Sequence, residues 1–192
     1  MNTQIFAQAI GIAAMIMNVC SYQRKSQKKI IVMQFFSSVL FCINMLMIGA
    51  LMGGLMNIAG IARAVVFFNK ERLGRSKPWW IAGFTVLYFV LYVCTFTVFG
   101  KAVTVPNLIV EFLPVVGMTS MTIGFAVNSA KYTRLLGLIN SPSWLIYNIA
   151  NGAIGGIIAE VFGIVSIMAA LLRFSRNGES DDLDATDESE PA

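Results

Sequence analysis

Long apolar runs recur along the whole chain, and they constrain its fold more than any other feature. Each is close to the ~20 residues that an α-helix needs to cross a ~30 Å hydrocarbon core. Of the 192 residues, 57% are hydrophobic and only 12% are charged, whereas soluble domains average about 25% charged residues. The sequence therefore predicts an all-α membrane protein with seven transmembrane helices. Their expected bounds are Ile5–Tyr22, Ile30–Ile48, Leu51–Phe68, Trp79–Phe99, Val105–Val127, Leu135–Ala150 and Ile154–Leu172.

The basic residues divide unevenly between the two sets of loops that these helices create. Lys101 is the one basic residue on the side of the second, fourth and sixth loops. An excess of lysine and arginine marks cytoplasmic loops, so we expect the N-terminus outside and the C-terminus in the cytoplasm, which needs an odd number of helices. The opposite loops and the end of the last helix hold twelve basic residues: Arg24, Lys25, Lys28, Lys29, Lys70, Arg72, Arg75, Lys77, Lys131, Arg134, Arg173 and Arg176.

A helical hairpin that bends at Gly49–Ala50 resembles a second one that bends at Gly152–Ala153. A shift of 103 residues aligns them with eight identities, three of which are glycines. Three helices reverse the direction of the chain, so a fourth is needed before a second group of three can have the same orientation. The chain is therefore expected to form a 3+1+3 parallel repeat, a plan found in some transporters. The expected segments are a first repeat (1–69), a linker helix (70–104), a second repeat (105–176) and a disordered, acidic cytoplasmic tail (177–192).

The two turns act as references for depth in the membrane. Phe41 and Asn57 each lie eight residues from Gly49, and Trp144 and Glu160 each lie eight residues from Gly152. At ~1.5 Å per residue, all four are ~12 Å below the outer face, near the centre of the bilayer. If the repeats face each other, two rings and two polar groups converge and can stack on and hydrogen-bond a small polar solute. Packing between helices is the alternative explanation.

Four more observations concern charged or amide side chains within the helices. A carboxylate near the membrane centre costs ~2.5–3.5 kcal/mol, so Glu160 should face a cavity or a partner. Arg63 either snorkels to the cytoplasmic surface or pairs with Glu160 or an anionic substrate. Glu111, near the outer mouth, either contacts solute there or forms an ion pair with Arg63 or Lys101. Asn148 lies nearer the outer face and is expected to line the access route.

Enzymatic functions find little support in the sequence. The chain has no histidine, which rules out a Ser/His/Asp triad, and its three cysteines fall inside apolar runs, so no metal site is expected. No cofactor is expected either. The charges lie in loops between helices and so indicate no nucleic acid. The expected partners are the lipid bilayer and a small polar solute, and the sequence leaves a homo-oligomer open.

Two local patterns resemble those of the YgjV-type inner-membrane proteins of bacteria. They are Glu111–Phe–Leu–Pro–Val–Val–Gly117, and Trp144–Leu–Ile–Tyr–Asn148 followed by Gly152–Ala–Ile–Gly–Gly156 and Glu160. The resemblance implies a multi-pass protein of the bacterial inner membrane.

More distantly, the 3+1+3 plan is similar to the SWEET sugar transporters and the PnuC vitamin transporters. A SWEET-type pocket pairs an aromatic residue with an asparagine sixteen residues later, a spacing that Phe41/Asn57 and Trp144/Glu160 match. This similarity implies a transporter that moves a small polar, sugar- or vitamin-like solute by alternating access. The alternative is a non-transport membrane scaffold or sensor. A cavity that holds Asn57, Trp144 and Glu160 would favour transport.

Overall fold

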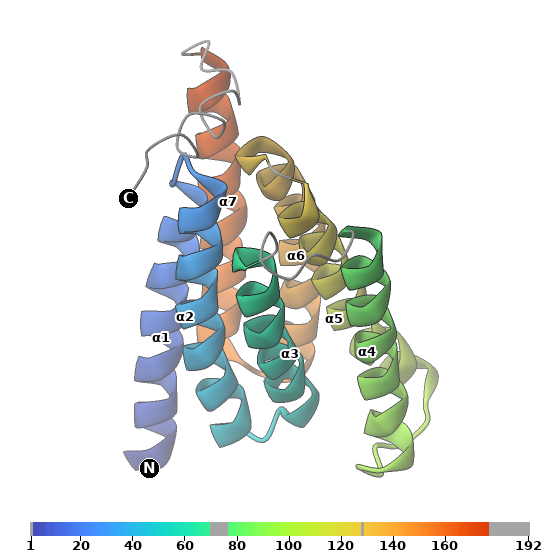
Figure 1. Cartoon of the computed structure of the whole chain (residues 1–192). Helices are drawn as coiled ribbons and strands as arrows, with labels where there is room; N and C mark the ends of the chain where they lie inside the picture. Colours follow the sequence, from blue (N-terminus) through green and yellow to red (C-terminus); the bar gives the residue numbers. More distant parts are fainter. Residues whose placement is uncertain (1, 70–76, 128, 177–192) are drawn as a thin grey trace.

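The computed structural model describes residues 2–69, 77–127 and 129–176, and within these ranges the chain forms seven helices and no strand (Figure 1). The predicted acidic tail and the predicted basic positions 70, 72 and 75 lie outside the described residues. The helices are α1 (Asn2–Tyr22), α2 (Gln27–Met47), α3 (Leu51–Phe68), α4 (Lys77–Thr97), α5 (Val105–Ala126), α6 (Ala130–Ala150) and α7 (Ile154–Arg176).

Successive helices run in opposite directions, so the loops gather at two ends of the molecule (Figure 1). One end holds the α1–α2 loop, the start of α6 and the end of α7. The opposite end holds the N-terminus and the links that contain Gly49, Lys101 and Gly152. The predicted division of charge between two ends is therefore present in the described residues. Which end faces the cytoplasm stays a prediction.

The prediction of seven membrane-spanning helices is confirmed in length and apolarity for six of the described helices, and for α6 it stays a prediction. Six of the described helices are long and apolar enough to cross a membrane, and α6 is not among them. It begins at Ala130, five residues before the expected start, because Ser129 caps it by accepting a hydrogen bond from the Tyr132 N–H at 3.5 Å. The helix consequently includes the charges Lys131 and Arg134, which we had expected in a loop.

Six of the helices pack into a closed ring. In it, α2 lies between α1 and α3, and α6 lies between α5 and α7. The two groups meet where α1 packs on α7 and α3 packs on α5, with a smaller contact between α2 and α6. Helix α4 is outside the ring and covers α3 and α5.

The two tight turns have the same backbone structure, which confirms the predicted hairpins. Gly49 and Gly152 adopt φ values of +80° and +64°, a conformation that suits glycine at the residue after a helix end. The residue after each glycine closes a further hydrogen bond to the preceding helix, as in a Schellman motif. The matching bonds are Gly49 N–Leu46 O and Gly152 N–Ile149 O at 3.2 Å, and Ala50 N–Met45 O and Ala153 N–Asn148 O at 2.9 Å.

Candidate functional site: a polar cavity inside the helix ring

A cavity lies inside the ring, and all six ring helices contribute residues to its wall. The volume within reach of water-sized molecules is about 60 Å³. One water needs ~10–15 Å³ by the same measure, so the space suits a few waters or one very small solute. Helix α4 contributes none of the residues in this wall.

Six of the seven predicted site residues line this cavity: Phe41, Asn57, Arg63, Trp144, Asn148 and Glu160. Asn57 is half-buried and the other five are buried. The four positions placed at one depth by counting from the turns therefore do surround one space. Their role in binding a solute stays a prediction.

Glu160 of α7 carries the buried carboxylate of the cavity. Its side chain is 6% exposed, and its Oε2 atom has no hydrogen-bond partner among the described residues. Ser141 of α6 is next to it, since a Cβ on Gly163 would lie 3.5 Å from Ser141 Oγ and 3.9 Å from Glu160 Oε2. The buried Ser141 hydroxyl faces this carboxyl group and the side chain of Tyr22. Burying an unpartnered polar group costs ~1–3 kcal/mol, so this corner of the cavity is suited to receive a hydrogen-bonding group.

Arg63 of α3 does not snorkel to the surface. It is 4% exposed, and its Nη1 donates a 3.0 Å hydrogen bond to the carbonyl oxygen of Met118 on α5. The guanidinium carbon lies 4.8 Å from the centroid of the Phe125 ring, which adds a cation–π contact. Its Nε is buried and has no acceptor among the described residues.

The remaining predicted residues differ in how they are held. The Asn57 amide donates to Gly53 O of its own helix at 2.8 Å, so its carbonyl oxygen is the atom that can serve the cavity. The Trp144 ring packs edge-on against the ring of Tyr147, with centroids 5.6 Å apart. The Oδ1 atom of Asn148 is buried and unpartnered within the described chain.

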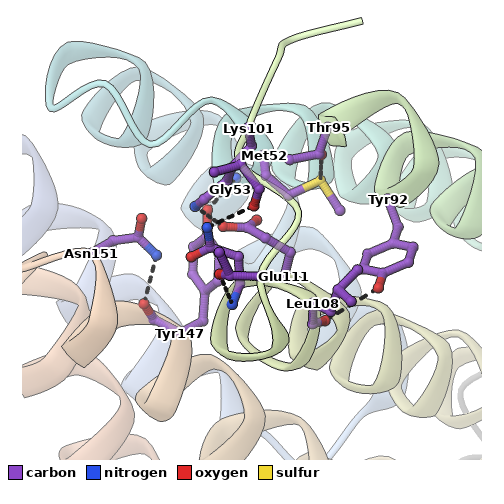
Figure 2. Close-up of polar contacts among 12 residues, drawn as sticks. Met52, Gly53, Tyr92, Thr95, Lys101, Leu108, Glu111, Tyr147 and Asn151 are labelled. Carbon is purple, nitrogen blue, oxygen red and sulfur yellow. Dashed lines mark hydrogen bonds and ion pairs between the residues drawn. The ribbon is translucent and has the colours of Figure 1, made fainter. Parts of the chain in front are cut away.

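Glu111 lies outside this cavity and pairs with Lys101, one of the partners we had considered (Figure 2). Its side chain is fully buried. Close by, the hydroxyl of Tyr147 accepts a 3.0 Å hydrogen bond from the Gly53 N–H and so joins α6 to α3. Figure 2 shows these contacts gathered near the link between α4 and α5. Glu111 therefore belongs to the end of the bundle that holds the glycine turns.

The opposite end is joined by side-chain amides and a guanidinium. Gln27 of α2 donates to the carbonyl oxygens of Gly124 and Val127 at 3.0 and 2.6 Å. Gln23 donates to Ser166 O of α7 at 2.8 Å. Arg134 of α6 donates to Tyr22 O at 3.0 Å and also bonds Arg24 O. These bonds connect the end of α1, the α1–α2 loop and the start of α2 to the second group of helices.

Sequence reasoning missed several polar residues of the wall. Asn18 and Gln34 stand alone in apolar runs of α1 and α2, and an isolated polar residue in such a run was a visible signal. Tyr22 is predicted only as the end of the first helix, and it also lines the wall. Asn140 lines the wall from α6. No cluster of three or more His, Cys, Asp or Glu side chains that could hold a metal is present in the described ranges.

A model of the Imp-YgjV family, described as bacterial inner membrane protein, matches residues 5–178. The chain belongs to this family. Membership confirms the predicted YgjV-type resemblance and the predicted location in the bacterial inner membrane. Several membrane-capable helices agree with a multi-pass Imp-YgjV protein. No curated protein and no solved structure matches the chain, so its similarity to SWEET and PnuC transporters stays a prediction.

Proposed function

We propose that this Imp-YgjV protein transports a small polar solute across the inner membrane by alternating access. The cavity carries the proposal, because six helices line it and its wall contains a buried carboxyl group and a buried guanidinium with unpartnered polar atoms. Ionisable residues are costly inside a membrane and typically mark solute or ion pathways. A scaffold has no need for such a cavity.

The pattern of helix contacts supports the 3+1+3 parallel repeat as part of this proposal. In this repeat, α1 corresponds to α5, α2 to α6 and α3 to α7. The contact between α1 and α7 then corresponds to the contact between α5 and α3, and the contact between α2 and α6 corresponds to itself. A two-fold axis along the membrane normal would produce this exchange. Helix α6 then crosses the membrane as α2 does, and its polar residues are tolerated because they face the cavity.

The contacts at the two ends supply the parts that alternating access would exchange. At the basic end, Gln27 and Arg134 bond carbonyl oxygens of the other three-helix group. At the glycine-turn end, the Gly53–Tyr147 bond and a 3.3 Å bond from the Gly155 N–H to Gln8 Oε1 connect the groups. Neutral hydrogen bonds contribute ~0.5–1.5 kcal/mol each and those of a charged group such as Arg134 ~1.5–3 kcal/mol, so opening either end costs a few kcal/mol in these bonds. The positive-inside rule makes the basic end cytoplasmic.

Solute uptake into proteoliposomes that contain the purified full chain tests the proposal. A panel of small sugars, amino acids and vitamins is offered to the parent protein and to Glu160→Ala. A matched pair of phenylalanines controls for packing: Phe41 lines the cavity, whereas Phe36 is 51% exposed on the outside of the same helix. We expect Glu160→Ala and Phe41→Ala to lower uptake and Phe36→Ala to leave it unchanged. No uptake of any solute would contradict the proposal.

Thiol labelling of an Asn57→Cys variant separates transport from scaffolding. Cys20, Cys42 and Cys94 are first replaced by alanine. Alternating access predicts modification of the thiol by membrane-impermeant reagents from both faces, with protection by the transported solute. A thiol that is unreactive from both faces would favour packing instead.

A further inference from the structure

An acidic and a basic side chain share the cavity without forming an ion pair with each other. Arg63 and Glu160 both line it, and they are 4% and 6% exposed. In the part of the chain that the structure describes, Glu160 takes part in no ion pair. Glu111, by contrast, is paired with Lys101. A buried charge is expensive without a partner of opposite sign. The arrangement therefore leaves one positive and one negative position to be satisfied within one small space.

The Arg63 side chain lies close to residues that line the same cavity as Glu160. Side chains on a helix tilt toward its N-terminus, which for α3 is the glycine-turn end. The acceptor of Arg63 is the carbonyl of Met118. The preceding residue, Gly117, lies beside Trp144, whose Cδ1 would be 3.2 Å from a Cβ at that position. Trp144 is the residue that counting from Gly152 places level with Glu160, and it lines the same cavity as Arg63 and Glu160.

The unpartnered atoms also divide by chemistry. Arg63 Nε is a donor, and a guanidinium has five N–H groups suited to a carboxylate. Glu160 Oε2 is an acceptor, and Asn148 Oδ1 is a second one. A carboxylate on the solute would satisfy the first position, and an ammonium group would satisfy the second.

We infer that the solute is a small zwitterion, which places its carboxylate on Arg63 and its ammonium group on Glu160. This inference rests on the transport function proposed above. A zwitterion neutralises both buried charges, whereas a lone anion or cation neutralises one and a neutral sugar neutralises neither. The volume of about 60 Å³ corresponds to about four to six waters, which suits the smallest amino acids.

Binding of matched probes to the purified full chain tests the inference. The probes are glycine and L-alanine as zwitterions, acetate as the anion alone, methylamine as the cation alone and glycerol as a neutral molecule. Each charge-assisted contact corresponds to about a tenfold to hundredfold change in affinity. Glycine or alanine should therefore bind at least about tenfold more tightly than the other three probes.

Two variants test which group of the solute is bound by Arg63 and which by Glu160. Arg63→Gln should weaken glycine binding by about tenfold or more and leave methylamine binding intact, whereas Glu160→Gln should weaken glycine binding similarly and leave acetate binding intact. Retained binding of the second probe shows that each variant is folded, and Arg63→Lys should recover part of the glycine affinity. If both variants fail to fold, the probe comparison on the parent protein decides.

The outcomes separate this inference from the function on which it rests. If glycerol binds the parent as tightly as glycine, or if only sugars are taken up into proteoliposomes, the zwitterion assignment is overturned and transport stands. If no solute of any class is bound or taken up, the transport proposal itself fails.

Discussion

The two hairpins, α2–α3 and α6–α7, share a backbone but differ in chemistry. Both bend through the same hydrogen-bonded turn. Both also place a glycine of the second helix against a serine of the first: a Cβ on Gly60 would lie 3.4 Å from Ser38 Oγ, and one on Gly163 would lie 3.5 Å from Ser141 Oγ. The shared glycines therefore fix how closely the two helices of each hairpin approach.

The difference lies in the side chains that face the cavity. Where the first hairpin has Met45 and Asn57, the second has Asn148 and Glu160. The polar residues within α6, among them Lys131, Arg134, Asn140 and Asn148, explain why this helix is less apolar than the other six described helices. The packing positions of the two hairpins therefore correspond, while each hairpin contributes a different ionisable group to the cavity: Arg63 in the first and Glu160 in the second.

Exchanging Asn57 and Glu160 tests this difference between the hairpins most strongly, because it is expected to change the affinity for the solute glycine. Glu160→Asn alone should lower glycine affinity by about 10- to 100-fold, because it removes a charged contact. Asn57→Glu alone should also lower it, because it adds a second carboxylate to the cavity. If the two positions are equivalent, the double variant with Asn57→Glu and Glu160→Asn should bind glycine about tenfold more tightly than Glu160→Asn alone. Equilibrium binding of radiolabelled glycine gives all four values of the cycle.

The outcome of the cycle decides how far the correspondence goes. A double variant that is no better than Glu160→Asn would show that the two positions are not interchangeable. Size-exclusion profiles of the four proteins confirm that each is folded.

What the sequence could predict was set by fixed local geometry. The glycines predict the two turns. Because a helix rises by a constant distance per residue, counting from Gly49 and Gly152 also predicts the depth of Asn57 and Glu160 in the membrane. What it missed depends on contacts between distant segments. Arg134 was assigned to a loop, yet it is 3% exposed and bonds the carbonyl of Tyr22, since only the packing of α6 against the end of α1 brings them together. For Glu111 the sequence left open a solute contact and an ion pair with Arg63 or Lys101, and the α4–α5 link is what brings Lys101 to it.

The next largest difference is expected at Tyr147 and Asn44, which the 103-residue shift aligns. Tyr147 binds the Gly53 N–H of the other three-helix group, whereas the Asn44 amide donates to Ala7 O within its own group at 2.7 Å. Tyr147→Phe should destabilise the fold by ~1–3 kcal/mol, because the Gly53 N–H is in the first turn of α3 and loses its acceptor. Asn44→Leu should cost ~0.5–1.5 kcal/mol, because the carbonyl of Ala7 lies within α1 and keeps its helical bond.

Unfolding of both variants by SDS in mixed micelles measures these free energies. Equal losses would mean that the bond across the two groups is no more important than the bond within one. A Tyr147→Phe protein as stable as the parent would remove this bond from the proposed closure of the glycine-turn end.

The smallest effect is expected from substitutions in the glycine turns, which are the feature that the two hairpins share most closely. Gly49 and Gly152 have positive φ values, and a Cβ on either would meet no atom within 4 Å. Alanine at each therefore carries only the penalty of the left-handed conformation, ~1–2 kcal/mol. Gly49→Ala and Gly152→Ala should lower the free energy of unfolding by the same amount in the same SDS titration, and neither should change glycine affinity. A clear loss at one turn alone would show that the two turns, despite their matching hydrogen bonds, do not carry equal weight in the fold.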